Sequence, residues 1–307
     1  MDNSFDSPAE ILFEEASGRK FPWVNIALFG LTCLSTLVVG TVLMGMYTNS
    51  LSDVIPFLGQ IVRSPSILLT GLPFSLAIMT ILLGHEMGHY LTCRYYGIDA
   101  SLPYFIPFPT LVGTMGAFIR IRSPFHNRAS LFEVGIAGPI VGFLLAIPTL
   151  FIALAKSGYV APSPSGTGLE LGEPLIFKAV EWIMGKTPPA GMEINLHPIG
   201  IAAWFGFFAT ALNLLPVGQL DGGHVSYALF RGNHKRISQA LLFTLIPVGF
   251  FYWQGWLIWA IILLIIGLRH PVTLDDSIPL SKRHVWLGWF ALTMFVLCFT
   301  PMPFYLN

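Results

Sequence analysis

Long apolar runs separated by short polar stretches dominate the chain. Their approximate bounds are Phe21 to Tyr47, Ile67 to Tyr96, Leu131 to Lys156, His197 into NLLPVGQLDGGH, Ser238 to Leu268, and Val285 to Thr300. About 20 apolar residues in a helix are enough to cross the hydrocarbon core of a bilayer. The pattern therefore predicts an all-α polytopic membrane protein with six to seven membrane segments.

The number depends on residues 238–268, which form either one long tilted span or a helical hairpin that turns near Trp253–Gly255. Loops on the cytoplasmic side of a membrane carry an excess of Lys and Arg. Basic residues flank this run on both sides, at Arg231, Lys235, Arg236, Arg269, Lys282 and Arg283. Both clusters are cytoplasmic only if the run enters the membrane and returns, so the charges favour the hairpin.

A different pattern occupies residues 102–123. A regular helix is excluded there by three prolines, Pro103, Pro107 and Pro109. The run GTMGAFIRIRS alternates, with Ile119 and Ile121 on one face, which is typical of a strand. Because an open strand edge cannot face lipid, we expect a short re-entrant β-hairpin that lines a cavity or packs in protein. Such an edge could accept an unfolded peptide as an added strand.

Composition agrees with a membrane protein, since only 10% of the 307 residues are charged, against about 25% in soluble domains. The formal net charge is zero, so nothing indicates a nucleic-acid partner. Residues 1–18 are acidic and contain no basic residue, unlike a signal peptide. No Arg- and Ser-rich transit segment precedes the first apolar run, which favours a bacterial plasma membrane.

The second apolar run contains His85-Glu86-Met87-Gly88-His89, which fits the pattern HExxH. Residues four apart share one helix face, so the two imidazoles can bind one zinc ion, with Glu86 beside a coordinated water. Glu86 would accept a proton from this water and return it to the leaving amine of a cleaved peptide. The alternative, polar residues near a membrane surface, is weak because ionisable residues are costly in membrane helices.

A catalytic zinc usually has three protein ligands, so one more is needed. The three cysteines lie in or beside apolar runs outside any CxxC pair and are interpreted as buried apolar residues: Cys33, Cys93 and Cys298. The acidic candidates are Glu133 and Asp221. Pro216 and the nearby glycines interrupt the apolar run just where it meets Asp221, as expected of a lined cavity. A cap on the following helix is the alternative for Asp221.

HEMGH followed by NLLPVGQLDGG resembles the site-2 protease family of intramembrane metalloproteases, over residues 66–230. The run PYFIPFP…GTMGAF…IR is similar to a bacterial and chloroplast branch of that family. The resemblance implies one zinc per chain, held by His85, His89 and Asp221, with Glu86 as the base. It implies that Asn213 binds the substrate backbone or the developing oxyanion. An interhelical hydrogen bond is the alternative for Asn213.

The resemblance also implies the substrate, a transmembrane segment of another membrane protein that a different protease has trimmed first. The expected regions are a polar tail 1–20, a first span and loop 21–65, a catalytic membrane core 66–230 and C-terminal membrane segments 231–307. His197 and His224 are interpreted as a helix-start and a surface histidine. Two other functions stay open, a metal-ion transporter and an inactive relative that binds membrane proteins. The oligomeric state is not indicated.

Overall fold

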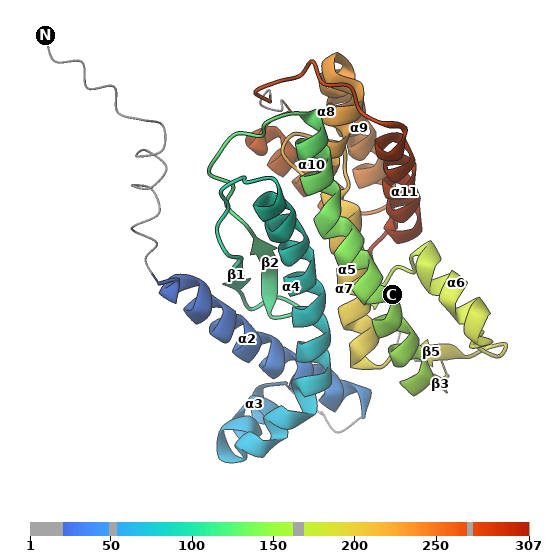
Figure 1. Cartoon of the computed structure of the whole chain (residues 1–307). Coiled ribbons are helices and arrows are strands. Elements are labelled where there is room, and N and C mark those ends of the chain that lie inside the picture. Colours follow the sequence, from blue (N-terminus) through green and yellow to red (C-terminus); the bar gives the residue numbers. More distant parts are fainter. Residues whose placement is uncertain (1–20, 49–53, 162–168, 269–272, 307) are drawn as a thin grey trace, which may run out of the picture.

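The protein is a bundle of helices that carries small antiparallel strand pairs (Figure 1). The computed structural model describes residues 21–48, 54–161, 169–268 and 273–306, and the expected polar tail 1–20 lies outside them. The helices are α2 (Trp23–Tyr47), α3 (Val54–Arg63), η2 (Pro65–Gly71), α4 (Leu72–Tyr95), α5 (Arg128–Lys156), α6 (Leu175–Met184), α7 (Pro198–Asn213), α8 (Asp221–Phe230), η3 (Arg231–Asn233), α9 (His234–Phe251), α10 (Gly255–Ile266) and α11 (Lys282–Cys298).

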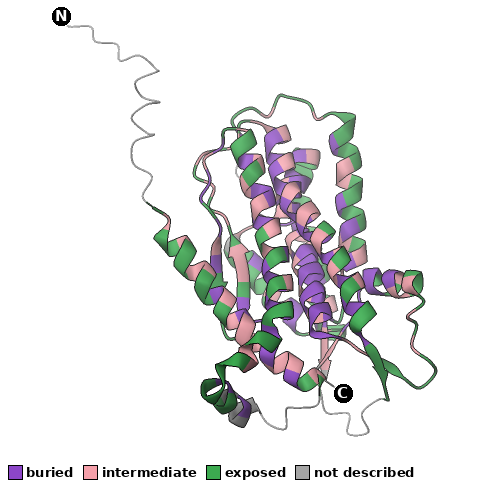
Figure 2. Cartoon of the chain, turned by 60° about the horizontal axis from the view of Figure 1, so that its bottom comes forward, coloured by how far each residue is buried: buried purple, intermediate pink, exposed green. Residues whose placement is uncertain are grey.

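Among the described residues, three helical segments are long and apolar enough to cross a membrane: α2, η2 with α4, and α5. Two shorter apolar helices are Pro198–Asn213 and Gly255–Ile265. Exposed residues lie along the outside of the bundle, while buried residues gather where its helices face one another (Figure 2). Many of the exposed ones are large and apolar, such as Trp23 and Phe251. The chain is therefore a membrane protein, and the larger number of six to seven segments stays a prediction.

Residues 238–268 do not form one continuous helix. Helix α9 ends at Phe251 and α10 begins at Gly255, so the chain turns where the hairpin interpretation expected. The two helices pack together near the turn, because a Cβ on Gly249 would lie 2.7 Å from the Leu257 side chain. The split agrees with the hairpin inferred from the flanking basic residues.

The expected β-hairpin is present and packs in protein. Strand β1 (Tyr104–Pro107) pairs antiparallel with β2 (Thr114–Phe118). Helix α2 supports it through two side-chain bonds: Asn25 Nδ2 donates to the Leu102 carbonyl at 2.9 Å, and Ser35 Oγ donates to the Gly113 carbonyl at 2.6 Å. The alternating run was expected to continue as a strand through Ile119 and Ile121. In the structure β2 stops at Phe118, and Ile121 makes only an isolated bridge.

Short strands were not expected in the polar stretch 157–195. Strand β3 (Gly158–Val160) pairs with β5 (Glu193–Asn195), and β4 (Leu169–Leu171) pairs with β6 (Phe304–Leu306). Gly172 extends the second pair, because its N–H donates to the Pro303 carbonyl at 2.9 Å. Its own carbonyl accepts from the indole of Trp204 at 2.6 Å. The last strand is thereby fixed to helix α7.

Helix α5 lies at the centre of the bundle and contacts α4, α7 and α8. Its apolar residues join the largest buried cluster, which includes Phe132, Leu150 and Trp204. Asn127 caps the start of α5, where its side chain accepts from the Ser130 N–H at 2.9 Å. The three cysteines are free. Cys93 and Cys298 are buried, as expected, whereas Cys33 is half-buried.

Candidate metal centre

Two imidazoles converge on one face of helix α4. His85 and His89 are one helical turn apart, and their Nε2 atoms lie 3.1 Å apart. Each side chain is buried, with 6–7% of its residue surface exposed. The His89 Nδ1–H points at the Val134 carbonyl of α5, 2.7 Å away. This bond orients the ring so that Nε2 faces the second histidine and is available to a metal.

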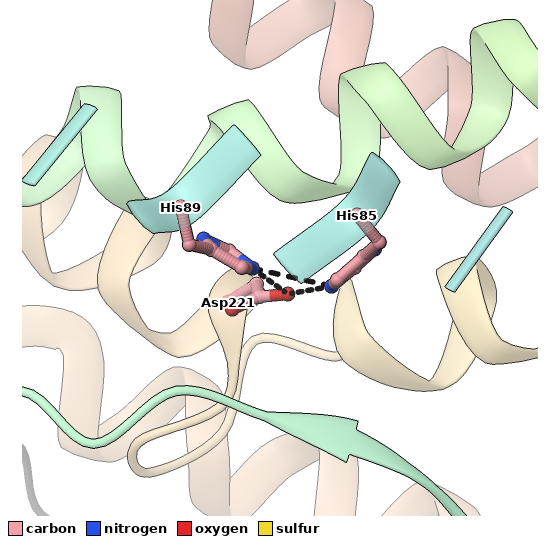
Figure 3. A group of neighbouring side chains, drawn as sticks. All are labelled: His85, His89 and Asp221. Carbon is pink, nitrogen blue, oxygen red and sulfur yellow. Dashed lines mark hydrogen bonds and ion pairs between the residues drawn. The ribbon is translucent and has the colours of Figure 1, made fainter. Parts of the chain in front are cut away.

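The third donor comes from the start of α8. Asp221 Oδ2 lies 3.3 Å from His85 Nε2 and 3.3 Å from His89 Nε2 (Figure 3). Helix α7 ends at Asn213 and the chain turns through residues 214–220 before α8 begins at Asp221. Asp221 is therefore the first residue of a new helix and does not end the preceding one. The N-cap of α8 is Leu220, so the alternative expectation, that Asp221 caps this helix, is wrong.

The spacing of the three donor atoms fits a tetrahedral zinc ion. Their separations are 3.1, 3.3 and 3.3 Å. Zinc bonds to His nitrogen and carboxylate oxygen are about 2.0–2.1 Å long, so the edge of a regular tetrahedron around zinc is about 3.3–3.4 Å. Among the described residues, His85, His89 and Asp221 form the group of at least three His, Cys, Asp or Glu side chains that could hold a metal. Two imidazoles and one carboxylate also suit zinc chemically.

Glu86 is buried beside these donors, with 6% of its surface exposed. Its carboxylate interacts electrostatically with all three of them, and it accepts a hydrogen bond from the backbone of Ile119. Ile119 directly follows strand β2, so the β-hairpin contacts the acidic residue of the HExxH motif. The carboxylate is thus held by the hairpin at the edge of the metal centre.

Asn213 also reaches the centre. Its Nδ2 lies 3.2 Å from His85 Nε2, although the residue is eight positions before Asp221 and lies on a different helix. Helix α7 stops at Asn213, in agreement with the break expected around Pro216. The turn 214–220 brings the Asn213 and Asp221 side chains together at His85.

The remaining candidates lie elsewhere. Glu133 Oε1 is 3.3 Å from His284 Nε2 on α11, and the Glu133 side chain also bonds Tyr96. His197 caps the start of α7, where its Nδ1 accepts from the Ile199 N–H at 3.2 Å. His224 is half-buried and contacts the ring of Phe125. Glu133 is therefore outside the group of metal-binding donors.

Two glycines of α5 contribute to the centre and were missed in the sequence. A Cβ on Gly138 would collide with the His89 ring, and a Cβ on Gly142 would lie 3.2 Å from His85 Nδ1. Both belong to the run GIAGPIVG, whose spacing of four residues places them on one helix face. That spacing was available in the sequence, but its meaning depended on knowing that α5 packs against α4.

A cavity of about 650 Å³ lies between α4, α7 and the β-hairpin, and its lining includes residues close in sequence to the centre. Leu82, one turn before Glu86, and Leu212, next to Asn213, line it. Met115 and Gly116 of strand β2 line its other side. Beyond Thr110 and Thr114 the lining is apolar, so the cavity suits an apolar chain that passes beside the metal centre.

The sequence model of Peptidase family M50 matches residues 73–252, more than half of the chain. The chain is 27% identical over 292 residues to "Probable zinc metalloprotease EGY2, chloroplastic" of Oryza sativa subsp. indica, covering 92% of this chain and 50% of the relative. The same protein of Arabidopsis thaliana is 28% identical over 291 residues (92% and 49%). "Probable zinc metalloprotease EGY1, chloroplastic" of Arabidopsis thaliana is 31% identical over 170 residues (53% and 30%). The chain thus spans about half the length of the first two relatives.

Proposed function

Because this chain belongs to peptidase family M50, we propose that it is a zinc-dependent endopeptidase that cleaves other membrane proteins within or beside their transmembrane segments. Membership agrees with the resemblance to the site-2 proteases. The observation that carries the proposal is the triangle of His85 Nε2, His89 Nε2 and Asp221 Oδ2 beside a buried Glu86. Zinc, when bound there, polarises the peptide carbonyl and acidifies the attacking water.

The chain's own residues divide the remaining work. Glu86 takes the proton of the attacking water and delivers it to the nitrogen of the leaving amine, which a buried carboxylate next to the ligands can reach. The Asn213 amide donates to the carbonyl oxygen of the scissile bond as negative charge develops on it. The Val134 carbonyl holds the His89 ring in place throughout.

The substrate enters in an extended form. A helix hides its carbonyls in backbone hydrogen bonds, so it must unwind before it can be cut. Among the described strands β2 pairs only with β1, which leaves its other edge open to an added strand. Thr114, Met115 and Gly116 of β2 line the 650 Å³ cavity, whose apolar lining suits the side chains of a transmembrane segment. By resemblance, the substrate has already been trimmed by another protease.

Other assignments fit the centre less well. A metal-ion transporter does not need a buried acid such as Glu86 beside its ligands, and an inactive relative does not need a complete ligand set. The bacterial plasma membrane, favoured by the sequence alone, is not confirmed, because the named relatives are chloroplastic. We propose that the chain is an integral membrane protein of a bacterial plasma membrane or of a chloroplast membrane.

Metal content tests the ligand set. The detergent-purified chain should hold about one zinc, and His89→Ala and Asp221→Ala should lose it by elemental analysis. Glu133→Ala is the matched control, because this acid pairs with His284 outside the centre and its removal should leave zinc unchanged. If Glu133→Ala lost its zinc while Asp221→Ala kept it, the third ligand would be Glu133 and the proposed ligand set would be wrong.

Cleavage tests the base. The chain is expressed with single-span membrane proteins that carry tags at both ends, and Glu86→Gln is compared with wild type. The variant keeps the shape of the side chain but cannot accept the proton, so we expect full zinc content and no cleaved product. Glu133→Gln, a second intramembrane acid, should cleave normally. Cleavage retained in Glu86→Gln would disprove the mechanism.

A further inference from the structure

A second cavity, of about 550 Å³, lies between α8, α9 and α11. Its walls are apolar almost throughout, with Leu241, Trp289 and Phe295 among them, and the Ser226 hydroxyl is an exception. That hydroxyl is already bonded to the His234 ring at 2.8 Å. None of the metal-centre residues lines this cavity. Its volume falls within the ~300–1,000 Å³ typical of small-molecule sites, and its lining suits a hydrocarbon chain.

Basic residues lie close in sequence to the residues that line one end of the cavity. Phe230 on α8, Ile237 on α9 and Val285 on α11 line this end, and each is close in sequence to exposed cations. Those cations are Arg231, Lys235, Arg236, Lys282 and Arg283. On α11, Lys282 is one turn before Val285 and so lies on the same helix face. We call the last four of these cations the basic rim.

The charge of the basic rim is not neutralised within the part of the chain that the structure describes. Arg231 lies 3.7 Å from Asp276, which partly offsets its charge. The nearby acid Glu133 pairs with His284. In contrast, no ion pair involves the four cations of the basic rim in the described ranges. Exposed Trp286 and Trp289 stand on the next turns of α11, and tryptophan is enriched where a membrane meets water.

Within the described residues, an apolar cavity that has exposed cations near one end, none of them in an ion pair, fits a molecule with a hydrocarbon tail and an anionic head. We propose that the cavity between α8, α9 and α11 binds an anionic phospholipid, with an acyl chain between the helices and the phosphate at the basic rim. The distribution of Lys and Arg predicts that the basic rim lies on the cytoplasmic side of the membrane. Anionic lipids on that side create a negative surface potential that attracts basic clusters.

The deep end of this lipid site adjoins the metal centre. Leu214 and Gly222 line the cavity, and they are the direct neighbours of Asn213 and Asp221 in the chain. An acyl chain in the cavity therefore packs against the turn that positions both side chains. The lipid site is separate from the proposed proteolysis and is tested without it.

Lipid retention by the full chain tests the proposal. The protein is stripped of lipid in detergent, incubated with equal amounts of phosphatidylglycerol and phosphatidylcholine, and examined by native mass spectrometry. We expect about one phosphatidylglycerol per chain and little phosphatidylcholine. Lys282→Gln with Arg283→Gln should weaken phosphatidylglycerol binding roughly tenfold or more, since each surface cation contributes to attraction for anionic lipid. Both side chains are exposed, so the fold should persist.

Matched variants separate the two parts of the site. Arg63→Gln with Arg94→Gln removes two exposed cations outside the basic rim and should change nothing. Val285→Trp fills the open end of the cavity and should abolish binding of either lipid, while zinc content confirms folding. Equal retention of both lipids by wild type would overturn the proposal. So would unchanged binding in Lys282→Gln with Arg283→Gln, or in a folded Val285→Trp variant.

Discussion

Two close helix contacts in this protein use glycine for different purposes. Where α2 meets η2 and α4, a Cβ on Gly71 would collide with the Leu37 carbonyl, and a Cβ on Gly40 would lie 2.6 Å from the Gly71 carbonyl. Where α4 meets α5, a Cβ on Gly138 would collide with the His89 ring. The missing side chain is replaced by backbone in the first contact and by a metal-binding side chain in the second.

The difference shows what each contact can tolerate. Backbone atoms of two packed helices cannot move apart locally, so crowding the first contact separates the helices and lowers stability. An imidazole can rotate away, so crowding the second contact leaves the helices together and misplaces a ligand. The first contact should therefore respond in stability and the second in metal binding, and four substitutions test this distinction.

The largest effect is expected for Gly138→Ala. The added methyl group occupies the position of the His89 ring, which must turn out of the triangle of donor atoms. We expect zinc affinity to fall about 100-fold, as when the surroundings of a metal ligand are disrupted. Zinc titration against a chelator measures this. Gly30→Ala is the control, because nothing lies within 4 Å of its added methyl group.

Gly142→Ala should have a smaller effect of the same kind. Its Cβ would lie 3.2 Å from His85 Nδ1, so the ring needs to shift by only a few tenths of an ångström. We expect zinc affinity to fall about tenfold, with the melting temperature nearly unchanged. If Gly142→Ala lowered the melting temperature strongly but left zinc affinity normal, Gly142 would be needed for packing of the helices and not for the position of His85.

Gly71→Ala should act in the opposite way. Its methyl group would meet the Leu37 carbonyl and the Thr41 N–H, two backbone groups of α2. We expect the free energy of unfolding to fall by about 1–3 kcal/mol, as for other overpacked contacts. Thermal unfolding in detergent measures the loss, and zinc content at saturating metal should remain normal. If Gly71→Ala lost zinc at temperatures below its unfolding transition, the two contacts would not differ in their effect on metal binding.

Thr36→Val should give the smallest effect. The Thr36 and Ser75 hydroxyls lie 2.7 Å apart and buried between α2 and α4. A side-chain hydrogen bond between membrane helices contributes about 0.6 kcal/mol on average, so the melting temperature should fall slightly. Zinc affinity should be the same as in wild type. A change in zinc affinity would mean that this contact communicates with the metal centre.

The sequence was sufficient for features that depend on local spacing. His85 and His89 share a helix face because they are four residues apart, and the structure places them 3.1 Å apart at Nε2. The break around Pro216 pointed to Asp221, which completes the donor triangle. The turn near Trp253 followed from the distribution of basic residues, and the structure has two helices there.

Features that depend on distant segments were not predictable in the same way. Strands β3 to β6 contain three residues each, which is too short for an alternating pattern to be recognised. The pairing of β4 with β6 joins segments on either side of the six described α-helices α6 to α11. The proximity of Asn213 to His85 arises from the path of the turn 214–220, which the break around Pro216 does not specify. The role of Gly138 appears only once α4 and α5 are packed together.

The pairing of β4 with β6 also sets an order of events during synthesis. As the chain leaves the ribosome, β4 emerges before helices α7 to α11, and its partner strand follows all of them. The pair therefore closes only after α11 is in place, and such long-range pairing is slow compared with helix formation. Until then the backbone groups of β4 that pair with β6 have no strand partner. Protection of β4 from an added protease would thus report that the C-terminal helices have assembled.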